Sequence, residues 1–124
     1  MIVALIAHDA KKADLVAFVS HRLKFFNRDD VSIITTGTTG KKLKQVGVKQ
    51  LTSVASGPLG GDAQIASHIV DGNVDAVIFF RDVLKKMPHD VDISMLLRLA
   101  DLYDTPLATN YATAKLIIKH FSNK

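Results

Sequence analysis

The stretch IVALIA, residues 2–7, is a continuous run of apolar residues that ends at the polar pair His8 and Asp9. A short apolar run bounded in this way is typical of a strand buried on both faces of a sheet. The run is far too short to cross a bilayer and no basic segment precedes it, so we expect neither a membrane span nor a signal peptide. The sequence therefore predicts a buried strand over residues 2–7.

Four further apolar runs follow along the chain: VSIITT (31–36), LTSVA (51–55), VDAVIFF (74–80) and PLATN (106–110). Apolar residues at helical spacing lie between or after them, namely Leu15, Val16, Val19, Leu23 and Phe26; Ile65, Ala66, Ile69 and Val70; Leu96, Leu99, Ala100 and Tyr103; and Leu116, Ile117, His120 and Phe121. A weaker helical pattern spans residues 39–46 and stops at Gly47. Strands that alternate with helices favour a parallel sheet covered on both faces, so we expect a three-layer α/β/α fold in a single domain of residues 1–124.

The length and composition agree with one folded domain. The chain has 124 residues, enough for one core and too few for two ordinary domains, and its 48% hydrophobic residues argue against disorder. It has no cysteine, which excludes disulfides and thiolate metal sites and favours a reducing compartment. We therefore expect a cytoplasmic protein.

The net charge of +4 comes with lysines in short groups: Lys11 and Lys12; Lys41, Lys42 and Lys44; Lys85 and Lys86. Such groups are common on solvated helix faces, and they are also suited to a small anionic ligand. A nucleic-acid partner is not expected, because the chain has no long basic run and only 6% aromatic residues.

Polar or glycine-rich segments follow every predicted strand: AHD (7–9), TTGTTGKK (35–42), SGPLGGD (56–62), RD (81–82) with PHDVD (88–92), and TNYAT (109–113). In parallel sheets, ligands bind beyond the carboxyl ends of the strands. We therefore look for the site in these five segments.

The segment TGTTG, residues 36–40, places small hydroxyls and unhindered backbone just before a helix. Amides at a helix start and the helix dipole both favour an anion, so this segment is a candidate phosphate cradle with Lys12 as its cation. The spacing matches neither the Walker motif nor GxGxxG. A plain turn explains the segment equally well.

The segment SGPLGGD sets Asp62 at the start of the helix that carries Ile65 and Ile69. Its glycines let the backbone come close to a ligand. An acid in this place is commonly an N-cap or a partner of the helix dipole, and it is also where a catalytic base would stand. The residues alone leave both interpretations open.

The five histidines divide into two groups. His21, His68 and His120 lie within helical segments, where packing or surface roles suffice for them. His8 and His89 lie in strand-end segments beside an acid. They form no recognised metal-ligand spacing with the neighbouring aspartates, so no metal is expected.

Taken together, AHD, TGTTG, SGPLGGD, IFFRD (78–82), PHDVD and ATN (108–110) resemble the methylglyoxal synthase family, in that order and along nearly the whole chain. The resemblance implies a five-stranded parallel sheet in the order 3-2-1-4-5, with His8 and Asp9 beside Arg81 and Asp82. It also implies a carbon-oxygen lyase that eliminates phosphate from dihydroxyacetone phosphate to give methylglyoxal, without a metal or organic cofactor and usually as a homohexamer.

The resemblance implies site residues position by position. Asp62 matches the family's proton-transferring aspartate and His89 the histidine that contacts the substrate oxygens. The substrate- and phosphate-binding positions match His8, Lys12, Thr36, Gly37, Thr38, Thr39, Ser56 and Gly57, and further acids of the pocket match Asp9, Asp82 and Asp92. Longer members continue with a phosphate-binding C-terminal extension that has no counterpart after KHFSNK (119–124), which puts phosphate regulation in doubt.

Two alternatives to the enzyme remain. The same fold serves as a regulatory module that senses phosphorylated ligands, which would keep the phosphate cradle without needing both Asp62 and His89. The second alternative is an ordinary structural domain whose glycine-rich turns only connect strands to helices. The presence of both side chains favours the enzyme.

Overall fold

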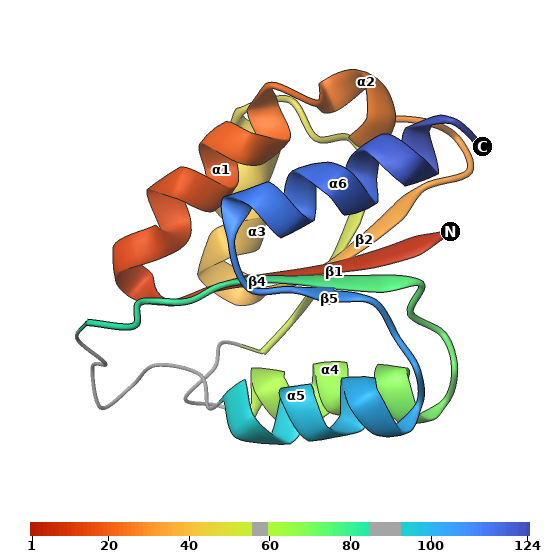
Figure 1. Ribbon diagram of the computed structural model, residues 1–124. Coiled ribbons are helices and arrows are strands. Elements are labelled where there is room, and N and C mark those ends of the chain that lie inside the picture. The colour runs from red at the N-terminus through yellow and green to blue at the C-terminus, as the bar shows by residue number, and fades with distance from the viewer. Residues whose placement is uncertain (56–59, 85–92) are drawn as a thin grey trace.

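The computed structural model describes residues 1–55, 60–84 and 93–124. Its strands are β1 (Ile2–Ala7), β2 (Ser32–Thr36), β3 (Leu51–Val54), β4 (Ala76–Phe80) and β5 (Leu107–Ala108). They form one parallel sheet in the order β3-β2-β1-β4-β5, which confirms the order implied by the resemblance (Figure 1). Residues 56, 57, 89 and 92 of the expected site lie outside the described ranges.

Helices cover both faces of the sheet, as the alternation predicts. They are η1 (Asp9–Lys11), a short 3-10 turn, and α1 (Lys12–Ser20), α2 (Leu23–Phe26), α3 (Gly37–Gln45), α4 (Gly61–Val70), α5 (Ile93–Leu102) and α6 (Tyr111–Ser122). Figure 1 shows α1, α2, α3 and α6 on one face and α4 with α5 on the other. None of the described helices is both long enough and apolar enough to cross a membrane.

The strand β1 is apolar throughout because each of its faces meets a different core. Val3 and Leu5 pack into the cluster that contains Phe18 of α1. Ala4 and Ile6 point the other way, into the cluster formed with α4 and α5. Successive side chains of a strand point to opposite faces, so a central strand with two cores must be apolar at every position.

The predictions for the first and last helices are wrong in detail. One helical face from Leu15 to Phe26 was expected, but α1 ends at Ser20 and α2 begins at Leu23. In α6 the buried residues are Ala114, Ile118 and Phe121, whereas Leu116 and His120, assigned to the core face, are exposed. The run LIIKHF has apolar residues on either face, and the buried face is the one that Ile118 and Phe121 share with Ala114, in the cluster with β1 and β4.

Two other expected core positions are also exposed, Val70 at the end of α4 and Tyr103 just beyond α5. The last strand is only Leu107–Ala108, shorter than the expected 106–110. The shortening has a local cause, because proline at 106 has no N–H for the ladder and Asn110 already caps α6.

Helix α3 starts at Gly37, two residues earlier than expected, so most of TGTTG is the first turn of a helix and not a loop. Gly47 follows its end with a φ of 110°, as expected for a glycine stop. Gly40 lets the helix lie close to β2 and β3: a Cβ there would collide with Ser53 Oγ and stand 3.2 Å from Thr35 Cγ2. The position of α3 on the sheet therefore depends on a glycine.

Candidate active site

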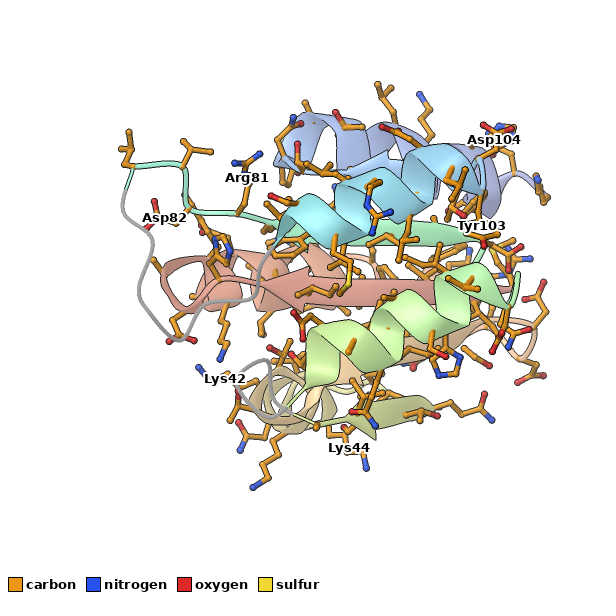
Figure 2. The ribbon with its side chains drawn as sticks, turned by 90° about the horizontal axis from the view of Figure 1, so that it is seen from below. Lys42, Lys44, Arg81, Asp82, Tyr103 and Asp104 are labelled. Carbon is orange, nitrogen blue, oxygen red and sulfur yellow. The ribbon has the colours of Figure 1, made fainter. Side chains whose placement is uncertain are left out.

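The carboxyl edge of the sheet brings together the segments that follow β1, β2 and β4. Because β1 is the central strand and pairs with both β2 and β4, the residues after these three strands are neighbours. Figure 2 shows Arg81 and Asp82 at this edge, whereas Tyr103 and Asp104 lie at the opposite end of the molecule. The fold thus gathers candidate residues from segments far apart in the sequence.

His8 links the ends of β1 and β4. Its backbone N–H donates to the carbonyl of Phe80 at 3.0 Å, and its side-chain Nδ1 accepts from the backbone N–H of Asp82 at 2.9 Å. The residue is 3% exposed, and its ring stands edge-on to that of Phe79, with 5.1 Å between ring centroids. Because Nδ1 is an acceptor here, the neutral ring carries its proton on Nε2. The expectation that His8 lies beside Asp82 is confirmed.

Lys12 connects the segment after β1 to the start of α3. Its Nζ lies 2.8 Å from Asp9 Oδ1 and donates to Thr38 Oγ1 at 2.9 Å. The side chain is 19% exposed, so its charge is only partly screened by solvent. This contact places the ammonium group at the first turn of α3, where the sequence predicted it.

The start of α3 has the features of an anion site. Thr36 is the N-cap, and its side chain makes no capping hydrogen bond, so it leaves the amides of Gly37 and Thr38 to other acceptors. The hydroxyl of Thr39, in the same turn, is buried and has no hydrogen-bond partner among the described residues. By contrast, α6 is capped by Asn110, whose side chain accepts from the Thr113 amide.

Asp62 lies in the first turn of α4, but it is not the N-cap. That position belongs to Gly60, with a φ of 94° that a residue with a side chain rarely adopts. Asp62 Oδ1 accepts from the neighbouring Ala63 N–H at 2.9 Å. The N-cap interpretation of Asp62 is therefore wrong. A partner of the helix dipole and a catalytic base both remain compatible with its position.

Two features of this edge were not anticipated. Gln64 Oε1 accepts from the Ala55 N–H at 2.7 Å and so ties the end of β3 to the first turn of α4. Arg81 has a buried Nε with no hydrogen-bond partner among the described residues, and its side chain points away from that of Asp82 (Figure 2). No sequence signal marks Gln64, because only the fold brings it to residue 55.

The structure links some of the predicted site residues by direct contacts and leaves others apart. His8 joins Asp82, and Lys12 joins Asp9 to Thr38. Asp62 has only its local contact among those described, and Ser56, Gly57, His89 and Asp92 lie outside the described residues. Within residues 1–55, 60–84 and 93–124, no group of three or more histidine or carboxylate side chains is placed to hold a metal ion.

Comparison with known proteins identifies the family. Residues 17–109 match the family model described as MGS-like domain. The chain is 47% identical over 119 residues to a methylglyoxal synthase of Borrelia garinii subsp. bavariensis, covering 96% of this chain and 93% of that one. It is 45% identical over 124 residues to a methylglyoxal synthase of Acholeplasma laidlawii, with both chains covered completely.

Solved structures agree. The chain superposes on the crystal structure of methylglyoxal synthase from Elizabethkingia anophelis with a TM-score of 0.88 and 42% sequence identity. The match covers 94% of this chain and 76% of the other. Sequence and three-dimensional structure therefore lead to the same conclusion: this chain belongs to the methylglyoxal synthase family.

Proposed function

We propose that this chain is a methylglyoxal synthase, a carbon-oxygen lyase that converts dihydroxyacetone phosphate to methylglyoxal and inorganic phosphate. Relatives named as such synthases share 45% to 47% of its residues over nearly their whole length. The structural observation that carries the proposal is the uncapped start of α3 with Lys12 bound to Thr38. That arrangement suits the phosphate group of a small substrate.

Asp62 is the proposed base. It removes a proton from the hydroxymethyl carbon, and the electron pair of that C–H bond forms the double bond of an enediolate. The enediolate electrons then expel phosphate by breaking the C–O bond on the other carbon next to the ketone. The hydroxyl of the deprotonated carbon loses its proton and becomes the aldehyde carbonyl, and protonation of the CH₂ carbon that phosphate has left completes the methyl group of methylglyoxal. The enediolate is the one formed in triose phosphate isomerisation, where the phosphate stays attached.

The start of α3 and Lys12 are proposed to decide which of these two outcomes follows. Elimination needs the C–O bond of the phosphate ester to stand out of the enediolate plane, where it overlaps the π electrons. If the phosphate is held by the amides of Gly37 and Thr38 and by Lys12 Nζ, the C–O bond is kept out of the enediolate plane, because the torsion about the neighbouring C–C bond can no longer change. The same groups stabilise the leaving dianion.

The remaining assignments belong to the same proposal. His89 donates to the enediolate oxygen, and His8, with its proton on Nε2, is a substrate-binding group. The residues Thr36, Thr39, Ser56 and Gly57 contact the substrate, and the acids Asp9, Asp82 and Asp92 belong to the pocket. No metal or organic cofactor takes part. The proposed assembly is a homohexamer in the cytoplasm.

The test is to mix the purified protein with dihydroxyacetone phosphate and to measure both released phosphate and methylglyoxal. Asp62→Asn should lower kcat by about 10²- to 10⁴-fold, the usual contribution of a positioned base. The matched control is Asp71→Asn, an exposed acid at the other end of α4, which should leave the rate unchanged. If the parent chain binds phosphate tightly without any turnover, the proposal is overturned in favour of a ligand-sensing module.

A further inference from the structure

A hollow lies between α2 and α6, two helices on the opposite face of the sheet from α4 and α5. Its volume is about 510 Å³, within the usual range of small-molecule sites. It is lined by Arg22, Lys24, Phe25, Arg28, Lys115, Ile118, Lys119, Ser122 and Asn123. None of these residues belongs to the proposed catalytic site. We name this hollow the α2–α6 groove.

The walls of the α2–α6 groove are strongly basic. Five of its lining residues are arginine or lysine and none is acidic. Arg28 is neutralised, because its Nε and Nη2 donate to the carboxylate of Asp30 at 2.9 and 2.7 Å. In the described part of the chain, no carboxylate forms an ion pair with Arg22, Lys24, Lys115 or Lys119. The groove therefore concentrates positive charge.

Arg22 is held in place by neutral groups. Its Nη1 donates to the carbonyl of Phe18 at 3.0 Å and its Nη2 to the hydroxyl of Tyr111 at 3.1 Å. The guanidinium also lies over the Phe18 ring, 4.1 Å from the centroid. These contacts fix its direction without cancelling its charge. A solvated surface cation would need no such support.

The floor of the α2–α6 groove is apolar. Phe25 and Ile118 lie at its base with at most 5% of each residue exposed, and the aliphatic stems of the surrounding lysines and arginines extend this apolar surface. A simple inorganic anion would use the cations and leave this floor in contact with water. A ligand with a flat apolar part and a chain of negative groups would use both features at once.

We propose that the α2–α6 groove binds a small organic polyanion of the nucleoside polyphosphate class. The ring system lies on the exposed edges of Phe25 and Ile118 and on the aliphatic stems around them, and the phosphates contact the ammonium groups of Lys24, Lys115 and Lys119. The lysines stand on two helices, so a ligand that spans them gains from both. The inference does not depend on the catalytic proposal, since the two sites share no residue.

The test is calorimetric titration of the full chain with ATP, with inorganic triphosphate and with adenosine. Each titration is done both without and with inorganic phosphate in excess, so that binding of ATP at the proposed phosphate site of α3 is recognised by its loss. We expect ATP to bind more tightly than either of its parts. The double variant Lys115→Gln with Lys119→Gln should lower the affinity about tenfold or more, since hydrogen bonds from charged groups to phosphate are lost.

The matched control is the double variant Lys44→Gln with Lys49→Gln, two exposed lysines outside the α2–α6 groove that give the same change in net charge. It should change the affinity for ATP less than twofold, roughly the effect of a distant screened charge. Equal losses in both double variants would overturn the site, because attraction would then be non-specific. Absence of ATP binding would overturn it too. Triphosphate binding as tightly as ATP would overturn the ligand class.

Discussion

Replacing Lys12 by glutamine is the most direct test of the proposed phosphate site at the start of α3. Opposite unit charges about 4 Å apart interact by about 4 kcal/mol at the effective dielectric constant near a protein surface. The Asp9 carboxylate, 2.8 Å from Lys12 Nζ, already neutralises part of the lysine's charge. We therefore expect the substitution to remove about 2 to 3 kcal/mol of transition-state stabilisation, which is about a 30- to 150-fold loss in kcat/KM.

The assay is the initial rate of phosphate release from dihydroxyacetone phosphate, with circular dichroism to confirm the fold. Lys11→Gln is the matched control, because this neighbouring lysine is 42% exposed and pairs only loosely with Asp14, at 3.8 Å. Its rate should stay close to that of the parent chain. Equal losses in the two variants would refute the reasoning. So would a Lys12→Gln chain that binds inorganic phosphate as tightly as the parent chain.

Three further predictions concern the surroundings of the site and the surface. Gln64→Leu removes the hydrogen bond to the end of β3, so it should lower the unfolding free energy measured in urea by about 1 kcal/mol and also slow catalysis. Gln64→Glu keeps an acceptor oxygen and should lower both the unfolding free energy and the rate less. Arg22→Met should raise the pKa of Tyr111 towards 10.0, because the hydrogen bond from Arg22 and then its charge lower that pKa. The pKa is read from phenolate absorbance in a chain whose other tyrosine is changed to phenylalanine, and an unchanged pKa would contradict the prediction. The hydrogen bond from Arg28 lowers the pKa of Asp30 below 3.8, so the stability difference between the parent chain and Asp30→Asn should be constant at neutral pH and shrink as the pH falls below that value.

The fold was predictable because its signals are local and agree with one another. The run over residues 2–7 has no polar position, which only a strand between two cores requires, and β1 does meet two cores. The face of α6 was not predictable in the same way. Leu116 and Ile118 are similarly apolar, yet Ile118 is buried on the same face as Ala114 and Leu116 is 68% exposed. Which of them faces the core depends on how the helix sits on the sheet, and the local pattern does not show this.

The candidate site was predictable only in part. A strand-end rule placed His8, Lys12 and the start of α3 at one edge, because parallel strands have their carboxyl ends together. The rule says nothing of which side chains meet. The bond from the Asp82 amide to His8 Nδ1 joins positions 74 residues apart, and Gln64 acts through a backbone group nine residues earlier. Such contacts depend on how the strands and helices align in three dimensions, which a local sequence pattern does not show.

The missing side chain at Gly40 has a consequence for redesign. A Cβ at this position would force the Ser53 hydroxyl aside and press on Thr35 Cγ2, so a large substitute would push α3 away from β2 and β3. The amides of Gly37 and Thr38 would then move with the helix, away from the proposed phosphate position. Mutational scans should therefore find that large side chains at this buried position reduce activity as much as changes at a ligand-contacting residue, because they displace α3.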